Sequence, residues 1–322
     1  MAALATPFTE MLGVRYPIAL APMGSVAGGK LAAAVSEAGG FGFVGGGYGE
    51  AQWLAAELRR VKDATRKPWG VGLITWSADR NIVELALAFR PHALLFSFGD
   101  PTPYAQMVRA AGCKLVCQVQ DLEGARLAKR AGADLIVAQG TEAGGHGGGR
   151  ATLPFVPAVV DLVAPTPVLA AGGIADGRGL AAALMLGACG ALIGTRFYAS
   201  EESAAHAAAK ARIVQAGGER TVRTRVFDVV RGLAWPAQYT GRALRNEFVE
   251  RWQGREAALA AQGEAGAARY RRAAQEGDFD TAAVWAGENA DLIGAVERAP
   301  ALVERIAAQA EALLRQGARM TQ

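Results

Sequence analysis

The 322-residue sequence is poor in cysteine and histidine, the residues from which disulfide frameworks and zinc sites are built. Its three cysteines are Cys113, Cys117 and Cys189. An odd number of cysteines without a dense framework predicts free thiols in a reducing, cytoplasmic environment. These cysteines lack convergent partners, so we expect no metal site and interpret each as a small buried side chain.

The sequence also lacks long apolar runs and a secretory signal. No basic region precedes an apolar segment near the N-terminus. The longest uncharged run, residues 179–195, is interrupted by glycines and is shorter than the roughly 20 residues that span a bilayer. We therefore expect no membrane partner.

No run of like charge stands out, although the net charge is +4. The basic residues between positions 220 and 245 alternate with acidic and apolar residues, and no nucleic-acid-binding motif accompanies them. This pattern favours a solvated face or attraction of anionic ligands, and we expect no nucleic-acid partner.

Glycine is abundant, with 41 residues, and it gathers between short apolar runs. Eight such runs recur along the first 200 residues: 17–21, 41–44, 70–75, 93–98, 114–119, 134–138, 167–171 and 190–194. Each is continuously apolar, which is typical of strands buried on both faces of a parallel sheet.

Helical patterns separate these runs, at 30–38, 50–62, 79–89, 101–111, 121–131, 155–163 and 177–186. Asp79, Asp121 and Asp176 stand where N-caps belong. Eight strand–helix alternations predict an α/β fold, a (β/α)₈ TIM barrel. The alternative is a doubly wound open sheet, but residues 23–29 match its glycine fingerprint poorly.

The alternation of apolar runs and helical patterns ends after Thr195. Residues 201–295 hold tryptophans and tyrosines among Ala, Arg and Glu and have a helical character. They predict a helical lid or substrate domain inserted after strand eight, while 1–200 and 296–322 form the barrel. Residues 300–316 form an amphipathic pattern, which we expect to be the eighth barrel helix.

A glycine-rich loop, residues 139–149, follows the sixth strand and surrounds His146. Function in such barrels lies at the carboxyl ends of the strands. An imidazole with an ordinary pKa of about 6.5 can act as a base there. The sequence around His92 and His206 indicates no function for either. Glu142 is the nearest carboxylate at a strand end, and no HExxH motif or Ser-His-Asp order is present. An organic cofactor therefore has to supply the difficult chemistry.

Glycines also end the seventh and eighth strands, where barrels commonly bind phosphate. Gly172 and Gly173 follow strand seven, and Gly194 and Thr195 follow strand eight. Their bare backbone amides, helped by the positive end of a helix, predict a phosphate site.

Four motifs, at 21–24, 139–146, 171–177 and 194–197, resemble the nitronate monooxygenase family, formerly called 2-nitropropane dioxygenases. Members are FMN-dependent (β/α)₈ barrels with a helical lid. The resemblance implies a cofactor site with four groups of contacts. The isoalloxazine would be lined by Ala21, Pro22 and Met23, and the flavin ring or ribityl chain would be contacted by Thr75 and Gln118. Gln139, Gly144 and Gly145 would lie along the cofactor, and the phosphate would be held by Gly172, Gly173, Gly194 and Thr195.

The resemblance also implies that His146 is catalytic. It takes the α-proton from a neutral nitroalkane or orients the nitronate, the flavin accepts an electron, and O₂ reacts. Some members carry Lys at the position of Gln118 and Asp at that of Gln139, so this chain lies outside that subgroup.

Two alternatives stay open. Enoyl-carrier-protein reductases of the same superfamily share the glycine–histidine loop, so an NAD(P)H-dependent flavin reductase acting on an enoyl thioester or a quinone fits equally. A flavin-free barrel that only binds a phosphate ligand is the third possibility.

Overall fold

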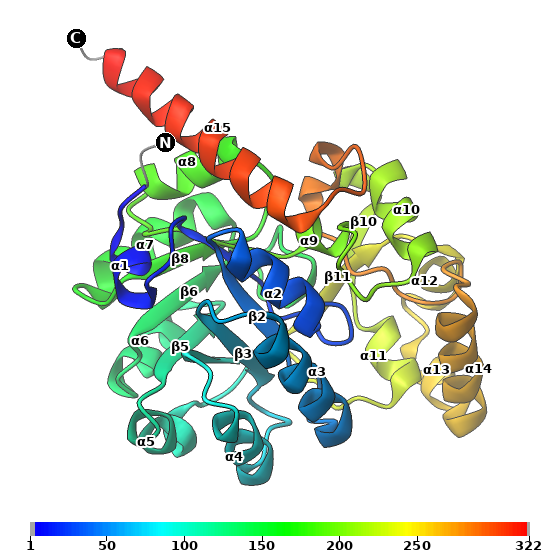
Figure 1. Cartoon of the computed structure of the whole chain (residues 1–322). Coiled ribbons are helices and arrows are strands. Elements are labelled where there is room, and N and C mark those ends of the chain that lie inside the picture. The colour runs from blue at the N-terminus through cyan, green and yellow to red at the C-terminus, as the bar shows by residue number, and fades with distance from the viewer. Residues whose placement is uncertain (1–3, 321–322) are drawn as a thin grey trace.

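The computed structural model describes residues 4–320. Its centre is a closed barrel of eight parallel strands (Figure 1). They are β1 (Ile18–Leu20), β2 (Phe41–Gly45), β3 (Trp69–Ile74), β4 (Ala93–Ser97), β5 (Lys114–Val119), β6 (Leu135–Gln139), β8 (Val168–Ala171) and β9 (Ala191–Ile193). β1 pairs with both β2 and β9, which closes the ring. The barrel prediction is confirmed, and the open-sheet alternative is wrong.

Both faces of the barrel strands are buried, as their continuously apolar sequences predict. Phe41 and Phe43 belong to the apolar cluster inside the barrel, whereas Val44 packs in the cluster between strands and helices. The short helix α1 (Pro7–Leu12) adds Phe8 to the inner cluster, where its ring meets Phe41 edge-on. Because Phe41 begins β2, α1 closes the amino end of the barrel, and the carboxyl end remains for ligands.

Helices cover the barrel: α2 (Gly29–Glu37), α3 (Ala51–Ala64), α4 (Arg80–Ala88), α5 (Thr102–Ala110), α6 (Leu122–Arg130), α7 (Thr152–Val163), α8 (Gly177–Met185) and α15 (Ala299–Arg319). The predicted caps Asp79, Asp121 and Asp176 each accept a backbone N–H from the first turn. The long α15 packs against α8 and α2, as the predicted eighth barrel helix should (Figure 1). Close contact needs Gly177, where a Cβ would lie 2.4 Å from the Ala310 nitrogen.

The segment between α9 (Thr195–Tyr198) and α15 is largely helical, as expected. Its helices are α10 (Ala207–Gln215), α11 (Val226–Arg231), α12 (Glu247–Trp252), α13 (Glu256–Ala260) and α14 (Gly263–Glu276), with 3₁₀ turns η1 (Gly218–Arg220) and η2 (Glu288–Leu292). The α-helices α10 to α14 share a second apolar cluster that includes Phe227, Val249 and Tyr270. We call residues 201–295 the lid.

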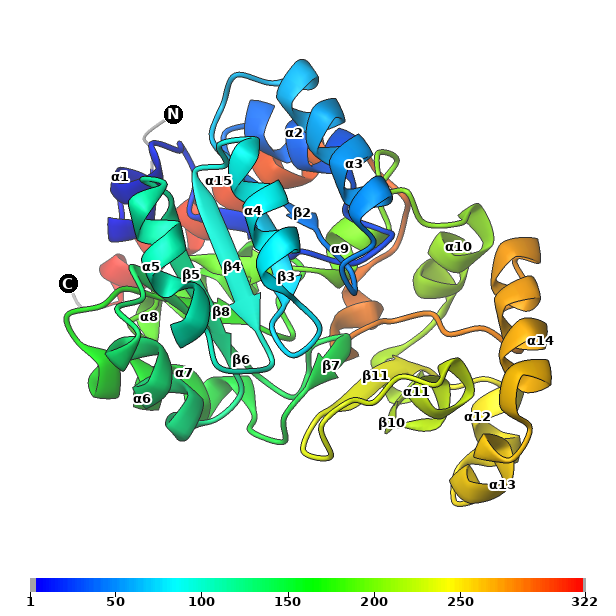
Figure 2. The same cartoon turned by 90° about the horizontal axis from the view of Figure 1, so that it is seen from below.

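The lid also contains two strands, which no sequence pattern indicates: β10 (Thr221–Thr224) and β11 (Thr240–Leu244). With β7 (Gly145–Gly147) they form an antiparallel sheet, in which His146 faces Gly241 across the ladder. Figure 2 shows β7 and β11 side by side between barrel and lid. The glycine–histidine loop is therefore partly a strand, fixed by a partner about 95 residues later in the chain.

No helix within residues 4–320 is long and apolar enough to cross a membrane.

Candidate active site

A cavity of about 430 Å³ opens at the carboxyl end of the barrel strands, beneath the lid. This volume lies in the range of small-molecule and cofactor sites. The barrel contributes strand ends and the loops that follow them, and the lid contributes Arg231, Trp235, Trp285 and Asn289. The active sites of barrel enzymes lie at this carboxyl end of the strands.

The structure brings nearly all of the predicted site residues together around this cavity. Those that line it are Ala21, Pro22, Met23, Gln118, Gln139, Gly144, Gly145, His146, Gly172, Gly173, Gly194 and Thr195. Their common position at strand ends explains this convergence, because all carboxyl ends of a parallel barrel meet at one rim.

Thr75 is the exception. Its side chain packs beside Gly99, where an added Cβ would lie 2.9 Å from the Thr75 Cβ, and it does not line the cavity. The preceding residue, Ile74, does. Thr75 lies in the turn that follows β3, one residue beyond the last strand residue that lines the cavity.

The glycine side of the cavity offers backbone without side chains. Gly172 and Gly173 have φ values of 106° and 72°, which only glycine adopts readily. At Gly194 an added Cβ would project among the cavity residues Ala21 and Met23, at 3.6 and 3.7 Å. Thr195 Oγ1 accepts a hydrogen bond from the Gly287 N–H at 3.0 Å, which ties this rim to the lid.

Amide side chains join the barrel rim to the histidine strand. Gln120 Nε2 donates to Gln139 Oε1 at 2.9 Å, and Gln139 Nε2 donates to the His146 carbonyl at 3.0 Å. Gln118 Nε2 donates to Ser97 Oγ at 2.9 Å. The glutamines therefore hold neutral polar groups at the cavity floor and fix the backbone of β7.

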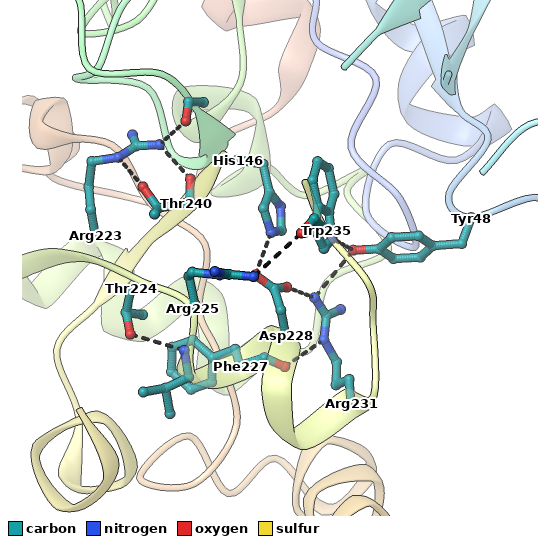
Figure 3. A network of polar contacts seen from close by, with 12 residues as sticks. Tyr48, His146, Arg223, Thr224, Arg225, Phe227, Asp228, Arg231, Trp235 and Thr240 are labelled. Carbon is teal, nitrogen blue, oxygen red and sulfur yellow. Dashed lines mark hydrogen bonds and ion pairs between the residues drawn. The ribbon is translucent and has the colours of Figure 1, made fainter. Parts of the chain in front are cut away.

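His146 forms a buried pair with a lid carboxylate. Its Nε2 lies 2.9 Å from Asp228 Oδ2, and the two side chains are only 8% and 3% exposed (Figure 3). Since a carboxylate accepts, Nε2 carries the proton and Nδ1 carries the lone pair. Nδ1 has no hydrogen-bond partner within residues 4–320. This arrangement presents a base whose orientation is held by a carboxylate.

Asp228 replaces Glu142 as the carboxylate beside the histidine. Glu142 instead accepts hydrogen bonds from the Thr152 N–H and hydroxyl at the start of α7. Asp228 lies on α11 and also pairs with Arg231 Nη2 at 2.9 Å. No sequence pattern indicates Asp228, because it lies 82 positions beyond His146 and reaches it only through the fold.

Aromatic rings enclose the pair. Trp235 stacks on the His146 ring with centroids 3.5 Å apart and planes 3° from parallel. Tyr48, in the loop after β2, accepts hydrogen bonds from the Trp235 and Arg231 side chains (Figure 3). The rings exclude water from one side of the cavity.

Burial lowers the pKa of His146 below its ordinary value, although the hydrogen bond and charge of Asp228 act in the opposite direction. The imidazole is therefore neutral near pH 7 and ready to accept a proton. When it does, the carboxylate of Asp228 stabilises the charge.

The remaining histidines and the cysteines lie elsewhere. His206 caps α10, and His92 Nδ1 accepts a weak hydrogen bond from the Trp69 N–H at 3.4 Å. All three cysteines are free and buried, and burial raises the pKa of Cys117 to about 12. Within the described residues, no three His, Cys, Asp or Glu side chains converge on a possible metal position.

The chain matches the sequence profile described as Nitronate monooxygenase over residues 5–82 and 74–309. It belongs to the nitronate monooxygenase family. Relatives of this chain are named for different activities.

A Mycobacterium tuberculosis protein is 38% identical over 251 residues, which cover 77% of this chain and 68% of that protein. It is named (3aS,4S,5R,7aS)-5-hydroxy-7a-methyl-1-oxo-octahydro-1H-indene-4-carboxyl-CoA dehydrogenase. The structure of FabK from Thermotoga maritima superimposes with a TM-score of 0.87 at 34% identity, covering 97% and 98% of the two chains. A nitroalkane oxidase from Streptomyces ansochromogenes gives 0.83 at 30% identity, covering 96% and 99%.

Members of the nitronate monooxygenase family are flavin-dependent oxidoreductases that use FMN. The cavity suits such a group. Its glycine rim leaves room where side chains would otherwise project, as at Gly194 and at Gly145, where an added Cβ meets nothing within 4 Å. Its floor offers neutral amide donors and acceptors from Gln118 and Gln139.

Proposed function

We propose that this protein is an FMN-dependent enzyme that oxidises small nitroalkanes and their nitronates with O₂. The observation that carries the proposal is the buried pair of His146 with Asp228. His146 belongs to the cavity wall, and its Nδ1 has no hydrogen-bond partner among the described residues. A base is needed to convert a neutral nitroalkane into its nitronate, because the proton on the carbon next to the nitro group must leave first.

The proposed FMN site follows from the residues around the cavity. Gly172, Gly173, Gly194 and Thr195 would hold the phosphate, and Ala21, Pro22, Met23, Gln118, Gln139, Gly144 and Gly145 would contact the rest of the cofactor. Bound FMN supplies the electron acceptance and the reaction with O₂ that no side chain can provide. Thr75 would support this wall from behind.

The residues of the chain then have separate tasks. His146 Nδ1 accepts the α-proton, and Asp228 holds the ring and stabilises the imidazolium. The stack with Trp235 adds a face that favours the cationic ring. The lid, residues 201–295, would serve as the substrate domain over a barrel formed by 1–200 and 296–322. A small, partly apolar substrate suits the aromatic wall.

A second candidate function has specific support, because the 38% identical mycobacterial relative is named as a CoA-thioester dehydrogenase. The same base could exchange a proton at the carbon next to a thioester carbonyl. In that case FMN would pass electrons between NAD(P)H and an enoyl thioester or a quinone. The His146–Asp228 pair serves either reaction, so it supports both over a flavin-free, non-catalytic barrel.

Oxygen consumption measured side by side with nitronate, with neutral nitroalkane and with NADH plus quinone tests the proposal. We expect rapid consumption with the nitro compounds and no need for NADH. Fast oxidation of NADH with quinone, without turnover of nitro compounds, would select the second candidate. A colourless purified protein that FMN cannot reconstitute would support the non-catalytic barrel.

A further inference from the structure

Tyr48 occupies a place in the cavity wall that base catalysis alone does not explain. It lies between Gly47 and Gly49, in the loop that joins β2 to α3, and it lines the cavity. Both neighbouring glycines have positive φ values, 57° and 95°, so the loop follows a path that presents this one ring.

The hydrogen bonds of the Tyr48 hydroxyl have a distinctive arrangement. Its oxygen accepts from Arg231 Nη2 at 3.2 Å and from Trp235 Nε1 at 3.1 Å (Figure 3). A phenolic oxygen has two lone pairs and one proton. Both lone pairs are therefore engaged, and the O–H proton has no acceptor within residues 4–320. The hydroxyl is left as a pure hydrogen-bond donor in the cavity wall.

The two groups that fix this donor also fix the base. Arg231 Nη2 pairs with Asp228 Oδ1 at 2.9 Å, and Asp228 holds His146. The indole of Trp235 stacks on His146 with one face while its N–H bonds Tyr48. Tyr48 and His146 are thus held by one network, and both line the same cavity. The Tyr48 O–H and the His146 Nδ1 both lack hydrogen-bond partners in the described part of the chain.

We propose that Tyr48 is a catalytic hydrogen-bond donor to the substrate oxygen that becomes negative when His146 removes the α-proton. The carbon–hydrogen bond breaks, its proton goes to Nδ1, and its electron pair forms the carbon–nitrogen double bond of the nitronate, which places charge on oxygen. Donors aimed at developing charge in a water-poor site lower the barrier strongly. The two N–H groups that bond the phenolic oxygen polarise its O–H and strengthen it as a donor.

The hydroxyl keeps its proton for this task. Burial raises the pKa of Tyr48 above its ordinary value, in spite of the opposing charge of Arg231. The inference rests on the proposed function for its substrate, but the same donor would serve a thioester carbonyl. Its test must therefore include a measurement that does not require turnover.

The probe is propionate, a planar carboxylate of similar shape to a small nitronate. Its dissociation constant is measured by calorimetry with the FMN-saturated full-length protein, for wild type, Tyr48→Phe and Tyr239→Phe. Tyr48→Phe keeps the ring that packs against Trp76 and Trp235. Tyr239 touches the same Trp235 ring but lies outside the cavity lining, so its variant is the matched control.

We expect Tyr48→Phe to weaken propionate binding about tenfold or more, and Tyr239→Phe to leave it unchanged. With neutral nitroethane, Tyr48→Phe should lower kcat by about 10²-fold. With ethyl nitronate, whose charge already exists in the ground state, it should mainly raise KM.

Equal propionate binding by wild type and Tyr48→Phe would overturn the inference, as would the absence of binding by wild type. If the wild-type protein does not turn over nitro compounds but its propionate binding still depends on Tyr48, the proposed substrate is refuted. The role of Tyr48 as a hydrogen-bond donor is then retained.

Discussion

Two walls of the cavity differ in the kinds of residue that form them. The wall at the ends of β1, β8 and β9, which we call the barrel wall, is mostly backbone and small side chains, with Gly172, Gly173 and Gly194 at its rim. The opposite wall, which we call the lid wall, carries aromatic rings and the buried His146–Asp228–Arg231 network. The lid supplies Asp228, Arg231 and Trp235, whereas His146 and Tyr48 come from β7 and from the loop after β2. One wall offers room and backbone amides, and the other offers a base, charge and exclusion of water.

The difference indicates a division of labour. On the proposed function, the glycine wall at the ends of β8 and β9 would hold a cofactor common to many relatives, because its backbone amides would bind phosphate. On the proposed function, the lid wall would carry out the proton transfer, because it holds His146 and Asp228. Changes on the barrel wall should therefore alter FMN affinity, and changes on the lid wall should alter turnover.

The largest effect is expected at His146. Replacing it with Ala should lower turnover of neutral nitroalkanes by about 10²–10⁴-fold, the usual contribution of a general base. FMN should remain bound, as its absorption band would show. His206→Ala, which removes the cap of α10 and a ring contact with Phe279 outside the cavity, is the control for histidine removal. Unchanged turnover would make His146 a structural residue.

Asp228→Asn comes next and tests the lid wall directly. The amide keeps the shape of the side chain but no longer requires the Nε2–H tautomer or stabilises the imidazolium. We expect kcat/KM with neutral nitroalkane to fall about 10²-fold, with FMN affinity unchanged. Because Asp228 raises the His146 pKa, the variant should also shift the pH profile to lower pH. A profile identical to that of wild type would contradict this role.

Gly194→Ala tests the barrel wall. Its φ of −105° suits any residue, so folding should be little affected, but the methyl group would project beside Met23 and Ala21. We expect FMN affinity to fall about tenfold, as an added methyl in a fitted site typically does. Fluorescence titration with FMN measures this. Gly149→Ala, at an open and exposed glycine, should have no effect.

The smallest effect concerns stability. The pKa of His146 is lowered in the folded state, so the unfolded chain binds the proton more readily, and folding stability falls as pH drops below about 6.5. The midpoint temperature of thermal unfolding should therefore fall less steeply between pH 7 and pH 5 for His146→Asn than for wild type. Parallel declines would argue against burial of a neutral imidazole.

The two walls also differ in how well the sequence predicts them. The barrel follows from local patterns: apolar runs give the strands, and Asp79, Asp121 and Asp176 cap helices as expected. Strand ends then predict the glycine rim without any long-range information. Thr75 shows the limit, since the sequence pattern does not define the end of a strand to one residue and Thr75 lies in the turn after β3.

The lid wall depends on contacts between distant segments. Asp228, Arg231 and Trp235 carry no motif and meet His146 only because β11 pairs with β7. Tyr48 lies in a glycine-rich loop that follows a strand, which is a usable signal, but its proposed role depends on two donors more than 180 positions later. Hydrogen bonds of this kind cannot be inferred from spacing.

The most direct test of the acid–base role assigned to His146 and Asp228 is anaerobic mixing of the FMN-loaded protein with nitroethane at several pH values, followed by flavin absorbance. The expected result is bleaching of the flavin without NADH, with a rate that rises through an apparent pKa below about 6.5. Rapid bleaching by NADH, with none by nitroethane or its nitronate at any pH, would contradict the proposed oxidation of nitro compounds.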